Sequence, residues 1–216
     1  MIDPDKTLKL RIEYAERPLD ESLVSKDPLA EFSLWFEEAI AAQIPLANAM
    51  TLATVSPTGK PSLRVVLLKQ ADETGFIFFT NYESRKGREL SSNPHAALNF
   101  FWPELERQVR IEGTISRVSE KECDEYFASR PRGSQIGAWA SHQSELLSSR
   151  KELEEIVDRF ELQFNDKPIP RPPNWGGYRL RPESIEFWQG RANRLHDRII
   201  YTLQSGNPWK IHRLYP

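Results

Sequence analysis

Two clusters of basic side chains lie at the ends of predicted elements and could bind an anion. Arg64 and Lys69 bracket four consecutive apolar residues of a predicted strand. The second cluster spans residues 81–86, where Ser84, Arg85 and Lys86 open a predicted helix. Free backbone N–H groups at a helix N-terminus bind phosphate. Basic side chains at that end oppose the helix dipole, so a bound anion would explain their placement. Solvated strand and helix ends are the alternative explanation for both clusters.

A third cluster combines hydroxyl and guanidinium groups around residue 130. Tyr126 and Arg130 are four residues apart and share one face of a predicted helix, which Pro131 ends. Arg132 and Ser134 follow in a predicted loop. Guanidinium and hydroxyl groups that converge in this way suit a phosphate monoester. Two phosphate-like sites in one small chain suggest a phosphorylated cofactor and a phosphorylated substrate.

The richest segment runs from residue 185 to residue 198. It places three arginines and His196 beside an aromatic strand end that contains Trp188. A solvated turn rarely holds tryptophan and histidine in such a mixture, which favours a functional role for this segment. Burial of Trp188 and His196 as ordinary core residues is the alternative.

Short segments of β-branched and aromatic residues, each bounded by turn residues, dominate the rest of the chain and predict strands. Their regular spacing favours an antiparallel meander that closes into a barrel. The predicted strands span residues 49–56, 63–69, 76–80, 96–102, 108–118, 177–180, 184–188, 198–203 and 209–214.

Flanking helices are predicted from capping signals. Asp27 followed by Pro28 begins one helix, and Ser84 begins another that ends before residue 93. Ser119 and Ser149 each precede a glutamate by three residues, the capping-box pattern. Apolar residues at helical spacing mark a buried face on the first helix: Leu29, Phe32, Trp35, Phe36, Ala39 and Ile40.

Composition bounds the domain organisation and the partners. The chain has 216 residues, which suits one domain: we expect a mobile N-terminal arm over 1–26 and a single domain over 27–216. A net charge of −2 gives no general reason to expect nucleic acid. The single Cys123 fits a reducing, cytoplasmic compartment. The apolar runs are too short to span a membrane, and we expect no metal site.

Six segments together resemble the pyridoxamine 5′-phosphate oxidase family, and they cover the chain from about residue 27 to its end. They are RVVLLK at 64–69, TNYESRK at 80–86, LERQV at 105–109, YFASRPRGSQIGAWAS at 126–141, Gln143-Ser144, and IEFWQGRANRLHDR at 185–198. Phe79 departs from the tyrosine expected in many members, so a hydrogen bond through that hydroxyl is in doubt.

The resemblance implies a mainly β fold with flanking helices, an FMN-binding split β-barrel, and a homodimer with two FMN sites at the subunit interface. Gln143, Ser144, Trp188 and Arg198 are expected to come from the partner subunit. The residues implied at the cofactor are Arg64, Val65, Val66, Leu67, Leu68, Lys69, Phe79, Thr80, Arg85, Lys86, Gln108, Gln143, Ser144, Trp188 and Arg198.

The resemblance also implies a reaction: oxidation of pyridoxamine or pyridoxine 5′-phosphate to pyridoxal 5′-phosphate, with O2 as the electron acceptor. Arg194 and His196 are implied beside the substrate ring, with His196 assisting proton removal. The implied substrate-binding residues are Lys69, Tyr126, Arg130, Ser134, Arg194 and His196, with Arg11 and Tyr14 covering the site.

Two alternative functions remain. A split-barrel flavin reductase that uses a nicotinamide or a deazaflavin would fit the fold, but it does not account for Tyr126, Arg130 and Ser134 together with the Arg194/His196 pair. A non-catalytic carrier of flavin or pyridoxal phosphate would not need Arg194 and His196. Oxygen consumption without added nicotinamide distinguishes the oxidase from the reductase.

Overall fold

The computed structural model describes residues 18–206 and 208–216. Arg11 and Tyr14, the two predicted covering residues, lie outside the described residues. Of the predicted arm over 1–26, the described part contains Leu19, which is buried and whose backbone N–H donates to Asp197 Oδ2 at 3.1 Å.

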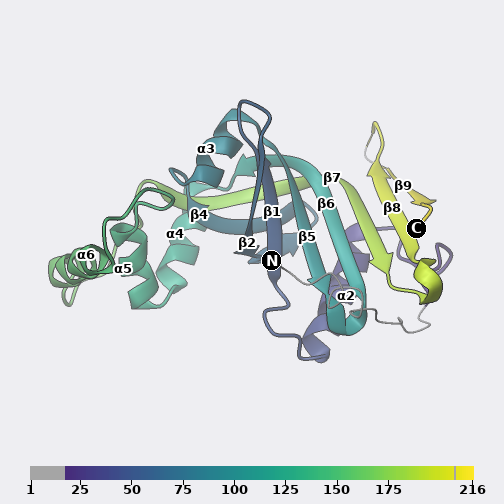
Figure 1. Cartoon of the computed structure of the whole chain (residues 1–216), viewed down its shortest axis with the longest axis horizontal. Helices are drawn as coiled ribbons and strands as arrows, with labels where there is room; N and C mark the ends of the chain where they lie inside the picture. Colours follow the sequence, from purple (N-terminus) through teal and green to yellow (C-terminus); the bar gives the residue numbers. More distant parts are fainter. Residues whose placement is uncertain (1–17, 207) are drawn as a thin grey trace, which may run out of the picture. The chain divides into compact units, whose positions relative to one another are not determined.

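The described part of the chain contains a nine-stranded sheet (Figure 1). The strands follow the order β2-β1-β5-β6-β7-β4-β3, with β8 paired to β7 and β9 paired to β8. Their bounds are β1 Ala49–Val55, β2 Pro61–Leu67, β3 Gln70–Asp72, β4 Gly75–Asn81, β5 His95–Trp102, β6 Arg107–Arg117, β7 Trp175–Gln189, β8 Asp197–Leu203 and β9 Trp209–Arg213.

The sheet differs from the predicted strands in three respects. β5 pairs with β1 rather than with β4, because a helical connection separates β4 from β5 and frees β5 from its sequence neighbour. β3 was not predicted, because its three residues fall in the short interval between the predicted strands over 63–69 and 76–80. β7 is one strand rather than two. Its pairing with β4 ends at Leu180, and its pairing with β8 begins at Ser184. Pro182 lies between these two paired segments, so the N–H group that proline lacks is not needed for a hydrogen bond to either strand.

Five α-helices accompany the sheet in the described residues: α2 Pro28–Ala41, α3 Arg85–Ser92, α4 Glu120–Ser129, α5 Arg132–Ala140 and α6 Arg150–Gln163. The caps predicted at Asp27, Ser84 and Ser119 are confirmed, the last as a complete capping box. Ser149 caps α6, but the carboxylate of Glu152 binds Ser148 instead of closing the box. None of these helices is long and apolar enough to cross a membrane.

The chain divides into two compact units. The first unit comprises described residues of 18–47, 99–111 and 183–216, and the second comprises residues 48–98 and 112–182. In the first unit, α2 packs Phe32 against Phe100 with ring centroids 5.1 Å apart, and Trp35 against Phe187 at 5.0 Å. The predicted buried face of α2 is wrong at Ile40, which is 56% exposed near the end of the helix.

The second unit contains β1–β4, the helices α3–α6 and the first part of β7. Phe127 of α4, Ile136 of α5 and Trp175 of β7 form one hydrophobic cluster, which Phe164 and Ile169 complete. Figure 1 shows α5 and α6 side by side, and they are in contact. This packing fixes α4 and α5 next to the start of β7, and these two helices and their junction carry the third predicted cluster.

Candidate functional site

A pocket of about 860 Å³ lies in the second unit. Strands β2 and β4, the start of α3, the α4–α5 junction and the loop after α5 all contribute to its wall. Most predicted second-unit site residues meet here: Arg64, Val65, Val66, Leu67, Lys69, Phe79, Thr80, Lys86, Tyr126, Arg130, Ser134 and Gln143.

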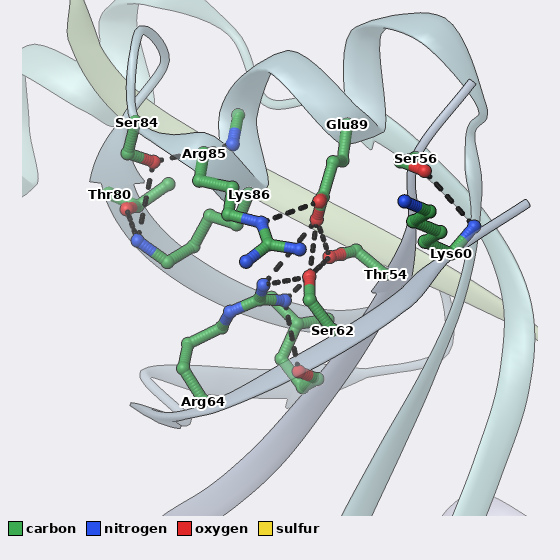
Figure 2. A network of polar contacts seen from close by, with 12 residues as sticks. Thr54, Ser56, Lys60, Ser62, Arg64, Thr80, Ser84, Arg85, Lys86 and Glu89 are labelled. Carbon is green, nitrogen blue, oxygen red and sulfur yellow. Dashed lines mark hydrogen bonds and ion pairs between the residues drawn. The ribbon is translucent and has the colours of Figure 1, made fainter. Parts of the chain in front are cut away.

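Arg64 lines the pocket, and its side chain reaches from β2 into a polar network, which Figure 2 shows. Its Nη1 donates to Thr54 Oγ1 at 2.6 Å and to Leu52 O at 3.1 Å. Its Nη2 donates to Ser62 Oγ at 2.6 Å and lies 3.4 Å from Glu89 Oε2. The alternation of strand side chains places Thr54, Ser62 and Arg64 on one face of the β1–β2 pair, and the guanidinium is therefore held in a fixed orientation.

Lys86 is the second cation at this end of the pocket, and it is only 8% exposed. Its Nζ donates to Gln143 Oε1 at 2.8 Å, to Thr80 Oγ1 at 3.1 Å and to Ser84 Oγ at 3.3 Å. All three partners are uncharged, and no carboxylate in the described residues pairs with Lys86. Burial, and then the nearby charge of Arg64, lower the pKa of Lys86 to about 8. An anion in the pocket would supply the missing negative charge.

The N-terminus of α3 lies at this same place. Ser84 accepts a hydrogen bond from the Gly87 N–H and so caps the helix. Gly87 is required by close packing, because a Cβ there would lie 2.0 Å from the carbonyl oxygen of Tyr82. The backbone of Tyr82 is itself tied to Asn174. The start of α3, and with it Lys86, is thus pressed against the end of β4.

Aromatic rings form the wall around the third predicted cluster. Tyr126 stacks on Phe79 with ring centroids 4.0 Å apart, and Phe79 stacks on Trp175 at 5.4 Å. The phenyl ring of Phe79 therefore packs in the wall, although it lacks the hydroxyl expected from the family. Lys69 Nζ lies 5.7 Å from the centroid of the Tyr126 ring.

The guanidinium group of Arg130 packs against the Trp175 ring, with its carbon 4.7 Å from the ring centroid. Its Nη1 is buried and has no hydrogen-bond partner among the described residues. Burial lowers the pKa of Arg130. No carboxylate among the described residues offsets this effect by pairing with the guanidinium group. A buried donor without a partner is costly, and a ligand oxygen at this position would remove that cost.

Two neighbours of Arg130 differ from the sequence prediction. Ser134 lies in the first turn of α5, not in a loop, and it does line the pocket. Arg132 donates to Phe164 O at 2.7 Å and to Lys167 O at 3.2 Å. Arg132 therefore has a structural role in the described chain, and only Arg130 of the two arginines lines the pocket.

A separate polar cluster occupies the β7–β8 corner of the first unit. Trp188 pairs in register with Arg198, and its ring lies 4.6 Å from that of His196. The buried Glu186 accepts from Arg198 Nε at 2.9 Å and Nη2 at 3.1 Å, and it also accepts from Arg110. These hydrogen bonds raise the pKa of Arg198. Trp188, His196 and Arg198 thus form one connected corner.

His196 is oriented by the backbone. The N–H of Arg191 donates to His196 Nδ1 at 3.1 Å, so in the neutral ring the proton lies on Nε2. Burial, and then the charge of Arg194, lower the pKa of His196 and favour this neutral form. Arg194 itself has a left-handed backbone, with φ of 61°. Such conformations in residues other than glycine are strained and cluster at functional sites.

Six predicted cofactor residues are not found in the pocket wall: Trp188 and Arg198, which belong to the corner described above, and Leu68, Arg85, Gln108 and Ser144. Leu68 is 6% exposed and is held through its backbone by Asn48. The side chain of Arg85 turns to Glu89, with Nε 2.9 Å from Oε1. Ser144 is exposed in the loop after α5, and Gln108 belongs to the first unit.

Conversely, two residues outside the predicted site list line the pocket: Asn81, which begins the second predicted cluster over 81–86, and Trp175. Asn81 follows the end of a predicted strand within a matched segment, and a polar residue at that place was a usable signal. Trp175 follows the proline-rich connector, and no local pattern marks it as part of a site.

Comparison with known proteins identifies the family. A model described as "Pyridoxamine 5′-phosphate oxidase" matches residues 36–164, and one described as "Pyridoxine 5′-phosphate oxidase C-terminal dimerisation region" matches residues 175–216. A pyridoxine/pyridoxamine 5′-phosphate oxidase of Burkholderia mallei (strain SAVP1) is 59% identical over 209 residues, 96% of this chain and 97% of the relative. That of Trichormus variabilis (strain ATCC 29413 / PCC 7937) is 55% identical over 213 residues, 98% of this chain and 100% of the relative.

Solved structures show the same fold. PhzG from Burkholderia lata 383, in complex with tetrahydrophenazine-1-carboxylic acid, is 33% identical with a TM-score of 0.87, over 93% of this chain and 98% of that one. A pyridoxamine 5′-phosphate oxidase-related, FMN binding protein from Nostoc punctiforme PCC 73102 is 18% identical with a TM-score of 0.71, over 89% of this chain and 100% of that one, and shows the fold alone. The predicted fold class, a mainly β split barrel with flanking helices, is confirmed. The chain belongs to the pyridoxamine 5′-phosphate oxidase family.

Proposed function

We propose that this chain is an FMN-dependent oxidase that converts pyridoxamine and pyridoxine 5′-phosphates to pyridoxal 5′-phosphate, with O2 as the electron acceptor. One observation carries the proposal: a single pocket holds two separate cations that lack a carboxylate partner among the described residues, Lys86 and Arg130. Two phosphate groups, one on the cofactor and one on the substrate, would match them. The high identity to the oxidases of Burkholderia mallei and Trichormus variabilis supports the same reaction.

The cofactor is FMN, and its phosphate fits the end of the pocket formed by Arg64, Lys86 and the start of α3. Lys86 would gain a charged partner there, and helix N–H groups add to the attraction. The pocket volume of about 860 Å³ lies within the usual range for ligand sites. Val65, Val66 and Leu67 on the exposed edge of β2 would lie along the flavin.

The substrate phosphate fits the other cluster. Arg130 offers a buried donor, and Lys69, Tyr126 and Ser134 also line this part of the pocket. Because the phosphate does not change during the reaction, these residues contribute uniform binding rather than transition-state stabilisation. Tetrahydrophenazine-1-carboxylic acid, the ligand in the PhzG structure, carries a carboxylate and no phosphate. The further donors Lys69, Tyr126 and Ser134 beside Arg130 favour a phosphate, which offers three acceptor oxygens, for this chain.

When bound, FMN supplies the two-electron chemistry: it accepts a hydride from the substrate carbon and gives the electrons to O2. The net reaction of the amine is pyridoxamine 5′-phosphate plus O2 and H2O to pyridoxal 5′-phosphate, ammonia and hydrogen peroxide. The alcohol needs no water and releases no ammonia. The chain's own residues bind the two phosphates and so fix the distance between the reacting partners.

The active unit is a homodimer. The family model matching residues 175–216 is described as a dimerisation region, and the resemblance takes Trp188 and Arg198 from the partner subunit. Because Trp188, His196 and Arg198 form one corner, they would enter the site together, along with Arg194. Light scattering that reports a fully active monomer of about 25 kDa would refute this arrangement.

His196 acts as a hydrogen-bond donor through Nε2 in this proposal. Its Nδ1 already accepts the Arg191 N–H, so proton uptake at Nδ1 would break that bond, and Nε2 carries the ring proton. This geometry favours donation to a polar substituent of the substrate ring over the proton removal predicted from the sequence. Arg194 would place its charge beside the same ring.

The decisive experiment uses the purified protein in air. The protein should release FMN on denaturation, consume O2 with pyridoxamine 5′-phosphate and form pyridoxal 5′-phosphate without added nicotinamide. Turnover that requires a nicotinamide or deazaflavin would instead indicate a flavin reductase, and binding without turnover would indicate a carrier. Faster oxidation of a tetrahydrophenazine carboxylate than of any phosphorylated B6 vitamer would move the function towards that of PhzG.

A further inference from the structure

Glu89 lies behind the cofactor end of the pocket and is a buried anion that the proposed function leaves unexplained. It sits on α3, one helical turn after Arg85, and is 5% exposed. Figure 2 shows its carboxylate facing Thr54 and Ser62 from the β1–β2 pair. Burial acts to raise the pKa of Glu89, but hydrogen bonds from Ser62, Thr54 and Arg85 outweigh it and lower the pKa to about 2. Glu89 is therefore ionised throughout the physiological range.

The two hydroxyls link this carboxylate to Arg64. Thr54 Oγ1 and Ser62 Oγ each accept an N–H from Arg64 at 2.6 Å. Each hydroxyl has a single proton, and a carboxylate can only accept, so both protons point to Glu89 Oε2, with Ser62 at 2.6 Å and Thr54 at 2.5 Å. The carboxylate thus orients both hydroxyls so that their lone pairs receive the guanidinium.

The same carboxylate holds a second cation through its other oxygen. Arg85 Nε lies 2.9 Å from Oε1, while Arg64 Nη2 lies 3.4 Å from Oε2. Among the described residues, the hydrogen bonds of Arg64 all run from Nη1 and Nη2, towards this network and Leu52. Glu89 therefore joins α3 to the β1–β2 pair at the point where Arg64 and Lys86 enter the pocket.

We infer that Glu89 is a positioning residue that organises Arg64 for the phosphate of the cofactor, acting through Thr54 and Ser62. The inference rests on the proposed function, which places that phosphate at Arg64 and Lys86. By holding the guanidinium in one orientation, the network removes the entropy that a free arginine would lose on binding. The gain should fall on the phosphate, because the hydrogen bonds of this network among the described residues do not involve Val65, Val66 or Leu67, which would lie along the flavin.

The sign of the effect distinguishes positioning from simple electrostatics. A carboxylate near a phosphate repels it, so removing the charge of Glu89 would strengthen FMN binding if the electric field alone mattered. If positioning dominates, the same change weakens FMN binding. Glu89→Gln makes this comparison at constant size, since glutamine cannot accept through both oxygens and so loses part of the network.

The test measures the dissociation constants of FMN and riboflavin with the full-length apoprotein, by quenching of flavin fluorescence. Riboflavin lacks the phosphate and serves as the internal reference. In Glu89→Gln we expect the dissociation constant of FMN to rise about tenfold or more, the loss typical of a charge-assisted hydrogen bond. That of riboflavin should change less than about twofold. Thr54→Val, which removes one bridging hydroxyl at constant shape, should act in the same direction.

Glu154→Gln is the matched control. Glu154 pairs with Arg150 at the same spacing of four residues and the same Nε–Oε1 distance of 2.9 Å, but on α6 and in solvent. Its substitution should change neither dissociation constant.

Equal weakening of FMN and riboflavin by Glu89→Gln and Thr54→Val would mean a merely structural role and overturn the inference. Unchanged or tighter FMN binding in both variants would also overturn it. If the unmodified protein bound FMN no better than riboflavin, the proposed phosphate site itself would be refuted.

Discussion

Replacing Arg130 by methionine tests the proposed substrate site most directly. Methionine keeps much of the aliphatic stem and can pack on the Trp175 ring, but it removes the charge and the buried Nη1 donor. Because that donor has no partner among the described residues, the substitution breaks no protein hydrogen bond of Nη1. Its main effect should fall on the ligand.

The expected magnitude follows from the missing bond. A hydrogen bond between a charged group and a phosphate contributes roughly 1.5–3 kcal/mol, which corresponds to a loss of about 10- to 100-fold in kcat/KM. The loss should appear mainly in KM, because the phosphate is bound equally in the ground and transition states. The stability of the ligand-free protein should change little: relief of an unpaired donor, about 1–3 kcal/mol, opposes loss of the cation–π contact, about 0.5–2 kcal/mol.

The assay is steady-state oxidation of pyridoxamine 5′-phosphate at saturating O2, together with the melting temperature of the ligand-free protein. Arg132→Met provides the matched control two residues away. Arg132 donates to the carbonyls of Phe164 and Lys167, so its loss should cost about 1–2 kcal/mol of stability. In a chain of this size that lowers Tm by about 2–8 °C, with KM unchanged.

Two results would refute the reasoning. An unchanged KM in Arg130→Met would show that the substrate phosphate binds elsewhere. A fall in Tm for Arg130→Met as large as that for Arg132→Met would show that Arg130, too, is structural.

Two further predictions concern titrating groups. FMN binding should favour the charged form of Lys86, whose pKa in the free protein is about 8. The dissociation constant of FMN should therefore be constant between about pH 7, where the FMN phosphate is mostly doubly charged, and about pH 8, and it should rise by up to roughly tenfold per pH unit above that. Lys86→Met should abolish this rise in fluorescence titrations. Glutamine can place an amide N–H near the position of Nε2, so His196→Gln should keep more of kcat than His196→Asn. If both variants were equally inactive and one limb of the pH profile of kcat were lost, His196 would instead transfer a proton.

Local hydrogen bonding explains which parts of the fold could be predicted from the sequence. The caps at Asp27, Ser84 and Ser119 involve partners within three residues, so the sequence contains both halves of each interaction. Strand segments were likewise marked by side-chain alternation and turn residues. The order of β1 and β5 in the sheet was not predictable in this way, because it depends on pairing between segments about 45 residues apart.

The same distinction applies within the site. Composition and spacing by themselves determined that Lys86, Tyr126 and Arg130 are candidates for binding phosphate. Only the tertiary structure decided between Arg130 and Arg132, because the carbonyls that engage Arg132 lie more than 30 residues further along the chain. A sequence pattern indicates which charged groups are present. Folding decides which of them are buried and which of them gain a partner, and therefore which charge is left unpaired. A buried charge without a partner is unfavourable until a ligand of opposite charge binds to it.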